Sequence, residues 1–321
     1  MATLKDLLGL VKELPEEAFA EAFEKLEEIK KTTQEALASA PMTCPHCGDS
    51  RCVRNGKNRN RQVFLCRGCK KTFFESSTSA IANSHSSASV WKAVIDDTVR
   101  GVSLDETAAS LDLTHQTVFN MRHKILYTVE QAILANPVML EGACQVDETY
   151  VLESEKGREF PFYHHREPRT NGKAQKPGLS NEYICLCTGF TSEGKMIARA
   201  VNRATPSKEE IEAVFGNRIE DDTILLVDGN KSYSTLKDRC PVIRVENEDK
   251  IELNRFHSYI KERLRKYRGV ATTYLNRYAA LFSETFGKPN EASDKIYDLM
   301  TKRNKSFSPL KTIMSENLTS L

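Results

Sequence analysis

Residues 143–152 read ACQVDETYVL and residues 223–229 read TILLVDG, and these two stretches decide the fold class of the C-terminal half. Each is a run of apolar residues with the length of one strand. Two further runs of this kind lie between them, at 182–190 and 195–201. Segments with helical spacing of apolar residues are interleaved with these runs, and the alternation predicts an α/β domain over residues 142–286.

Two carboxylates stand where strands of this domain would place them. Asp147 lies in the first run, and Asp228 ends the last run directly before Gly229. An Asp at the end of an apolar strand is often a metal ligand at the edge of a sheet. Glu148 should point to the opposite face, because side chains alternate along a strand, and it is not counted as a ligand. The alternatives are a solvent-facing Asp147 and an Asp228 that only forms a turn.

The stretch LNRFHSYIK at 253–261 is predicted to be helical. Asn254, His257 and Lys261 then share one face, since they are three and four residues apart. Two Asp ligands and one ligand from a helix can hold divalent ions against a phosphodiester. Lys261 could orient a phosphate as a point charge. The alternative is a His257 that simply packs on the sheet.

Nine cysteines include two CxxC pairs, CPHC at 44–47 and CRGC at 66–69. This spacing is typical of a zinc ribbon, in which two such pairs complete a tetrahedron. The predicted ligands of one structural Zn²⁺ are Cys44, Cys47, Cys66 and Cys69. Cys52 and His46 are interpreted as non-ligands. Unrelated cysteine pairs are the alternative.

Charge is unevenly distributed, although 46 Lys and Arg nearly balance 44 Asp and Glu. The segment 1–38 is amphipathic and carries about −4, which predicts packing or dimerisation helices. The segment 41–75 carries about +6 and includes interleaved Phe residues. It is predicted to bind the DNA backbone through Arg54, Lys57, Arg59 and Arg61. A purely structural hairpin or a protein-binding ribbon remains the alternative, as a solvated loop does for the basic segment 156–180.

A helix-turn-helix is predicted within residues 88–135. Gly101 ends its first helix, Ser103 opens the second with a capping-box pattern, and Thr114 caps the third. Side chains on the open faces of the third helix could contact base edges; they are His115, Gln116, Asn120, Arg122 and His123. The alternative is an ordinary three-helix bundle that joins two domains.

Taken in order, these motifs resemble a family of bacterial transposases. CPHC and CRGC, the helix-turn-helix, DETYV, LSNEYICLCTGF, LLVDGNKSY and NRFHSYIK resemble the zinc-ribbon group named for insertion sequence fifteen ninety-five, over about residues 44–286. The resemblance implies a ribonuclease-H-like domain that cuts and joins DNA with Mg²⁺. It matches Asp147 and Asp228 to the first and second catalytic Asp. His257 takes a third position that varies among Glu, Asn and His, with Asn254 beside it and Lys261 as the following basic residue.

A histidine at the third position changes the expected metal chemistry. Mg²⁺ is hard and prefers oxygen, so imidazole is a weaker ligand than a carboxylate. His257 therefore suits Mn²⁺, a contact with phosphate, or a weakened activity. A catalytically inactive DNA-binding regulator on the same scaffold is accordingly the alternative function, and a zinc-ribbon protein-interaction module is a third.

The combined prediction is a multidomain α+β chain that acts as a DNA transposase. Its parts are N-terminal helices at 1–40, a zinc ribbon at 41–75, the helix-turn-helix at 88–135, the catalytic domain at 142–286 and a tail at 287–321. Its expected partners are double-stranded DNA, namely the terminal repeats and the target, and further copies of itself in a dimer or larger synaptic assembly. Without an apolar run of about 18 residues no membrane span is expected, and the cytoplasm, at the nucleoid, is the expected location.

Overall fold

The computed structural model describes most of the chain between residues 44 and 301. The described ranges are 44–58, 61–74, 79–82, 84–157, 173–246 and 250–301. Predictions that concern the N-terminal helices, Arg59, the side chain of Arg61, most of the basic loop and the end of the tail lie outside them. Within these ranges, every helix is too short or too polar to span a lipid bilayer. The chain divides into two compact units, residues 1–77 and 78–321, and each is described by itself.

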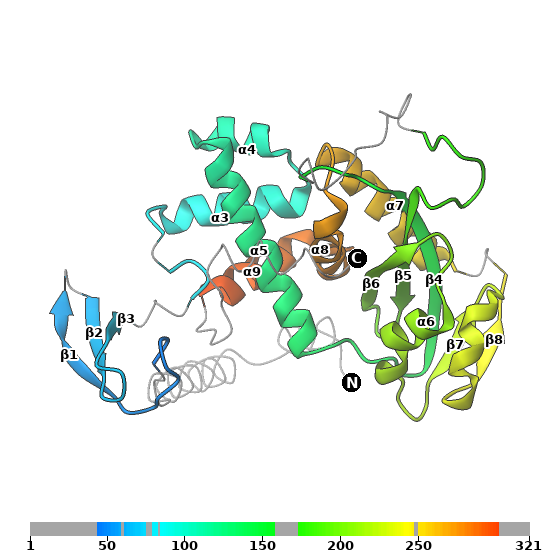
Figure 1. Cartoon of the computed structure of the whole chain (residues 1–321), viewed down its shortest axis with the longest axis horizontal. Coiled ribbons are helices and arrows are strands. Elements are labelled where there is room, and N and C mark those ends of the chain that lie inside the picture. The colour runs from blue at the N-terminus through cyan, green and yellow to red at the C-terminus, as the bar shows by residue number, and fades with distance from the viewer. Residues whose placement is uncertain are drawn as a thin grey trace, which may run out of the picture. The chain divides into compact units, whose positions relative to one another are not determined.

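The first unit contains an antiparallel three-stranded sheet in the order β1-β2-β3 (Figure 1). Its strands are β1 (Cys52–Asn58), β2 (Arg61–Cys66) and β3 (Thr72–Phe74). Cys44, Cys66 and Phe73 are its only fully buried hydrophobic residues among those described. So small a core cannot offset the entropy of the chain, whereas structural zinc can contribute roughly 10–16 kcal/mol of apparent folding free energy.

The second unit is built around a mixed five-stranded sheet in the order β6-β5-β4-β7-β8. The strands are β4 (Ala143–Leu152), β5 (Tyr183–Phe190), β6 (Met196–Arg203), β7 (Ile224–Val227) and β8 (Val242–Arg244). Strands β4, β5 and β6 pair antiparallel, whereas β4, β7 and β8 pair parallel. The four predicted strand segments and the mixed α/β class are confirmed.

Helices cover both faces of this sheet (Figure 1). On one face lie α6 (Lys208–Phe215) and the 3₁₀ helix η4 (Lys231–Asp238), and on the other lie α7 (Ile251–Lys266) and α8 (Leu275–Thr285). Strand β5 is buried on both sides, with alternate residues in the two cores. The thiols outside the first unit are small core residues here; they are Cys144, Cys185, Cys187 and Cys240.

The segment predicted to be a helix-turn-helix contains α4 (Leu104–Leu111) and α5 (His115–Ala135), preceded by α3 (Ala88–Arg100). The capping box at Ser103 and the cap at Thr114 are both confirmed. These helices are not a free-standing bundle. Helices α3 and α5 share one hydrophobic core with α7, α8 and α9 (Pro289–Thr301).

This shared core removes two residues from the surface that was expected to face DNA. Arg122 is buried, its Nη2 donates to the Val102 carbonyl at 2.8 Å, and its guanidinium lies 5.2 Å from the centre of the Tyr267 ring. His123 is buried between the rings of Phe119 and Tyr274. The expectation that both side chains are open to DNA is therefore wrong, because this side of α5 packs on the rest of the unit.

Burial gives His123 a measurable effect on stability. Desolvation, followed by the charges of Arg277 and Arg122, lowers the pKa of His123 from 6.5 to about 3. Between these values the unfolded chain binds a proton that the folded chain does not, so stability falls as the pH drops below 6.5. We predict that His123→Phe removes this loss, which is at most about 1.4 kcal/mol per pH unit. Urea unfolding at pH 7 and pH 5 measures it.

The matched control is the exposed His115, where the same change to Phe should leave the pH dependence of unfolding as in the wild type. Parallel pH profiles for wild type and His123→Phe would contradict the assignment of a neutral, buried imidazole.

Candidate metal centres

Asp147 and Asp228 meet because of the register between β4 and β7. The parallel pairing matches Gln145 with Leu226, and two residues further along the same register Asp147 stands beside Asp228, just past the end of β7. Carboxylate oxygens of Asp147, Glu148 and Asp228 lie within 4.8 Å of one another. We call these three side chains the acidic cluster. Asp147 is buried and the other two are half-buried.

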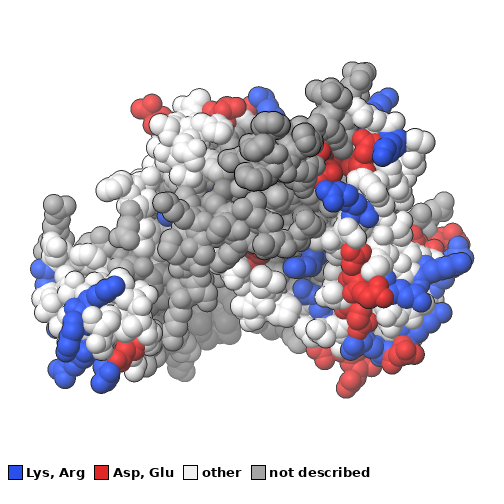
Figure 2. All heavy atoms as spheres, viewed as in Figure 1, with Lys and Arg blue, Asp and Glu red and all other residues white. Residues whose placement is uncertain are grey.

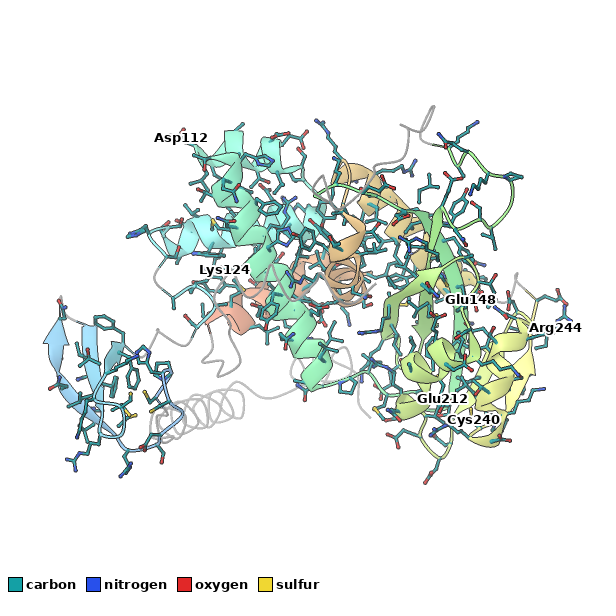
Figure 3. All side chains as sticks on the ribbon, in the orientation of Figure 1. Asp112, Lys124, Glu148, Glu212, Cys240 and Arg244 are labelled. Atoms are coloured by element: carbon teal, nitrogen blue, oxygen red, sulfur yellow. The ribbon has the colours of Figure 1, made fainter. Side chains whose placement is uncertain are left out.

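Glu148 leaves β4 on the face opposite Asp147, as predicted, but its exclusion from the group of carboxylates is wrong, because its oxygen lies within 4.8 Å of those of both aspartates (Figure 3 labels Glu148). Its side chain does leave the strand on the side of η4, where Asn230 Nδ2 donates to Glu148 Oε1 at 2.9 Å and the buried Tyr233 lies nearby. However, β7 ends at Val227, so no strand separates the two faces beyond that point. Alternation predicts the direction of the Cα–Cβ bond but not the place that a long side chain reaches.

The electrostatics of the acidic cluster favour binding of a cation. Burial, together with the negative charges of Asp147 and Asp228, raises the pKa of Glu148 to about 7. Three carboxylates this close repel one another, and a divalent ion relieves that repulsion. Oxygen donors suit Mg²⁺ or Mn²⁺. The side chains present therefore fit a divalent metal.

Lys250 also belongs to the site, although no sequence motif indicates it. It precedes α7, is fully buried, and its Nζ lies 2.8 Å from Asp147 Oδ2. A single lysine before a helix carries no sequence signal. Its burial follows from tertiary packing alone.

His257 reaches the same region through Thr188, the residue of β5 that pairs with Asp147. Thr188 Oγ1 donates to the Asp147 carbonyl at 2.9 Å and lies 2.7 Å from His257 Nε2. Because one hydroxyl carries one hydrogen, His257 Nε2 is the donor to Thr188, and Nδ1 keeps its lone pair. Burial, then the charges of Lys261 and Lys250, lowers the pKa of His257 to about 4, so the ring is neutral at pH 7.

The structure therefore brings together only part of the predicted catalytic set. Asp147 and Asp228 lie in one cluster, whereas His257 is held beside the backbone of Asp147, outside the group of ligand atoms within 4.8 Å. Asn254 and Lys261 lie on the exposed side of α7, one turn before and one turn after His257, as the predicted helix requires.

The four predicted zinc ligands converge in the first unit, and they are Cys44, Cys47, Cys66 and Cys69. The sulfurs of Cys44 and Cys69 are 3.6 Å apart, as are those of Cys47 and Cys66. Four Zn–S bonds of about 2.3 Å in a tetrahedron place the sulfurs about 3.8 Å apart, so the arrangement fits a tetrahedral ion.

Both CxxC pairs are shaped by the same turn. The residue after each pair, Gly48 or Lys70, has a positive φ, of 75° and 62°, and its amide donates to the carbonyl of the first cysteine. The Cys69 amide, which points at Cys66 Sγ, is the largest cause that lowers the pKa of the Cys66 thiol to about 7. Partial burial instead raises the pKa of Cys52 to about 11, and its sulfur lies outside the group of four.

The exposed surface of this sheet is basic. Arg54 and Lys57 are exposed on β1, and Figure 2 shows Lys and Arg gathered over the sheet. In the second unit, His115 and Gln116 are exposed at the start of α5, and Gln116 Nε2 donates to Asn120 Oδ1 at 2.9 Å.

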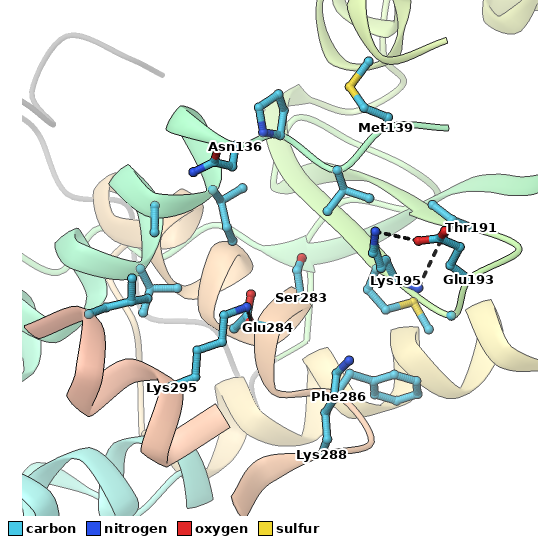
Figure 4. Close-up of a pocket in the computed structure, with 18 of the residues that line it drawn as sticks. Asn136, Met139, Thr191, Glu193, Lys195, Ser283, Glu284, Phe286, Lys288 and Lys295 are labelled. Atoms are coloured by element: carbon cyan, nitrogen blue, oxygen red, sulfur yellow. Dashed lines mark hydrogen bonds and ion pairs between the residues drawn. The ribbon is translucent and has the colours of Figure 1, made fainter. Parts of the chain in front are cut away.

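A cavity of about 480 Å³ lies away from these residues (Figure 4). It is bordered by the end of α5, the turn between β5 and β6, α8 and α9. Lys195 pairs with Glu193 at 2.6 Å on its rim, and Lys295 pairs with Glu284. No residue of the acidic cluster lines it, so the candidate catalytic residues are not part of this cavity.

The cysteine site predicts a specific loss of metal. We expect Cys66→Ser to lower the zinc content of the purified protein from about one ion per chain to almost none, because three thiolates hold Zn²⁺ far less tightly than four. Mass spectrometry of the metal content measures this. The control, Cys52→Ser, should keep its zinc, and equal zinc contents in the two variants would contradict the assignment.

No protein-family model matches the chain. It is similar to an uncharacterized protein in the transposable element ISH50 of Halobacterium salinarum, with 25% identity over 268 residues that cover 78% of this chain and 88% of that protein. Two solved structures, a pre-cleavage Mos1 transpososome and a Mos1 transposase paired-end complex with the left transposon end, are 12% and 13% identical, with TM-scores of 0.25 and 0.27. The matched regions cover 62% and 68% of this chain and 75% and 79% of the two Mos1 chains. These TM-scores are too low to establish a common fold.

Proposed function

We propose that the chain is a DNA transposase that binds the terminal repeats of an insertion sequence and catalyses metal-dependent cleavage and strand transfer. The observation that carries the proposal is the acidic cluster at the end of β7. The similarity over 268 residues to a protein of a transposable element supports it. The catalytic domain is the mixed sheet with its covering helices, of the ribonuclease-H-like type with a DDE or DDH set of residues.

The residues of the site divide into groups that hold metal and groups that hold DNA. Asp147 and Asp228, with Glu148 beside them, would hold Mg²⁺ or Mn²⁺. A divalent ion there would supply positive charge to the scissile phosphate and lower the pKa of an attacking water or 3′-hydroxyl. His257 would complete the set through the lone pair of Nδ1. Lys261 would hold a flanking phosphate, because it is exposed one turn further along α7.

Recognition of DNA would be divided between the two units. Gln116 and Asn120 would read base edges in the major groove, since amide side chains match the donor and acceptor of adenine. His115 would contact the DNA beside them. Arg54 and Lys57, with Arg59 and Arg61, would neutralise phosphates around the zinc ribbon. Zn²⁺ is assigned a structural role there, because all four ligands are cysteines.

Transposition joins two ends of one element, so the active species is proposed to be a homodimer or larger synaptic assembly on double-stranded DNA. The proposed location is the cytoplasm, at the nucleoid, where that DNA lies.

The direct test is cleavage and strand transfer on DNA that carries the authentic ends of the element. With Mn²⁺ or Mg²⁺ the wild type should cut and join these ends. Asp147→Ala and Asp228→Ala should each reduce the rate by about a hundredfold or more, because each removes a ligand of the metal that stabilises the transition state. The exposed Asp221, close to Asp228 in sequence, supplies the matched control, and Asp221→Ala should be as active as the wild type.

A gel-shift assay on the same end DNA measures binding separately from catalysis. Asp147→Ala should still shift end DNA in a gel. Gln116→Ala should lose roughly 1–3 kcal/mol of the binding free energy that distinguishes end DNA from unrelated DNA. A wild type that binds ends but never cuts them would favour the DNA-binding regulator. Full activity in Asp147→Ala would contradict the assignment of the site.

A further inference from the structure

We propose that Lys250 is the internal counter-ion of the acidic cluster, and that its ammonium and a divalent metal ion compete for Asp147. The inference rests on the proposed metal site and goes beyond it. Lys250, which lies outside the predicted catalytic set, would then determine how tightly the site binds metal.

The burial of Lys250 is the first observation. Its side chain is 0% exposed, whereas Lys261 on α7, the helix that Lys250 precedes, is exposed to solvent. A buried ammonium is costly unless an opposite charge compensates it. The contact of 2.8 Å between Lys250 Nζ and Asp147 Oδ2 supplies that compensation. Lys250 is therefore held in the unit by the same carboxylate that is proposed to bind metal.

The position of Lys250 is the second observation. Its Nζ contacts Asp147 directly, and the Asp147 carbonyl accepts from Thr188, the residue that His257 contacts. The ammonium thus lies at the first member of the proposed catalytic set. A cation that binds Asp147 on this side must take the place of the ammonium or accept its repulsion at short range.

Charge balance gives the direction of the effect. The acidic cluster carries three carboxylates, and Lys250 is the cation that contacts it among the residues described. Without metal, this positive charge stabilises Asp147. With a divalent ion bound to Asp147, the same charge is unfavourable, because the ammonium repels that ion at short range. Removal of Lys250 should therefore weaken the metal-free fold and strengthen metal binding.

The test measures Mn²⁺ affinity by titration calorimetry on the full-length, zinc-loaded chain without DNA. We expect Lys250→Met to bind Mn²⁺ about tenfold more tightly than the wild type. Lys250→Arg keeps the charge and should bind no more tightly than the wild type. The matched control is Lys237→Met, which removes the same charge from an exposed position on η4 and should leave the affinity unchanged.

A second measurement covers the case of an unstable variant. Melting temperatures are compared with and without saturating Mn²⁺, and Mn²⁺ should raise that of Lys250→Met more than that of the wild type. An affinity equal to or weaker than that of the wild type overturns the inference. So does an equal loss of stability with and without Mn²⁺, or a failure to fold at saturating Mn²⁺. If the wild type and all variants bind no Mn²⁺, the proposed function itself has failed.

Discussion

The early end of strand β7 is the constraint on which the candidate site depends. β7 pairs with β4 for only a few residues and stops at Val227, while β4 continues through Asp147 and Glu148. Asp228 follows directly and is brought beside Asp147 by the parallel register. The open end of the sheet then allows Glu148 to join from the opposite face. A longer β7 would keep the two faces apart and leave Glu148 with the core under η4.

Helix α7 connects the site to the segment predicted to be a helix-turn-helix. Helix α7 carries His257 and Lys261, and the region where it ends contacts the helices that precede the proposed recognition helix. The Tyr267 hydroxyl donates to the Thr98 carbonyl, and Arg268 Nη2 lies 3.3 Å from Glu106 Oε1. Since α3 and α5 share their core with α7 and α8, DNA held by α5 would have a defined position relative to the acidic cluster.

Local signals in the sequence were sufficient for much of this structure. The CxxC pairs, the capping box at Ser103 and the apolar runs around Asp147 and Asp228 each depend on neighbouring residues, and each is found as predicted. The errors concern long-range packing. Arg122 was expected to face DNA but is buried against the ring of Tyr267, and Glu148 was assigned away from a cluster that it joins. Lys250 was missed because only the folded chain places it against Asp147.

The central claim is that the end of β7 is a divalent-metal centre. Diffraction from crystals of the full chain grown with Mn²⁺, recorded at the manganese absorption edge, tests it most directly. An anomalous peak is expected within coordinating distance, about 2 Å, of the carboxylates of Asp147 and Asp228. Zn²⁺ at the four cysteines would be distinguished by its own edge. Crystals that contain Mn²⁺ but show no peak at these carboxylates would contradict a metal centre at the end of β7.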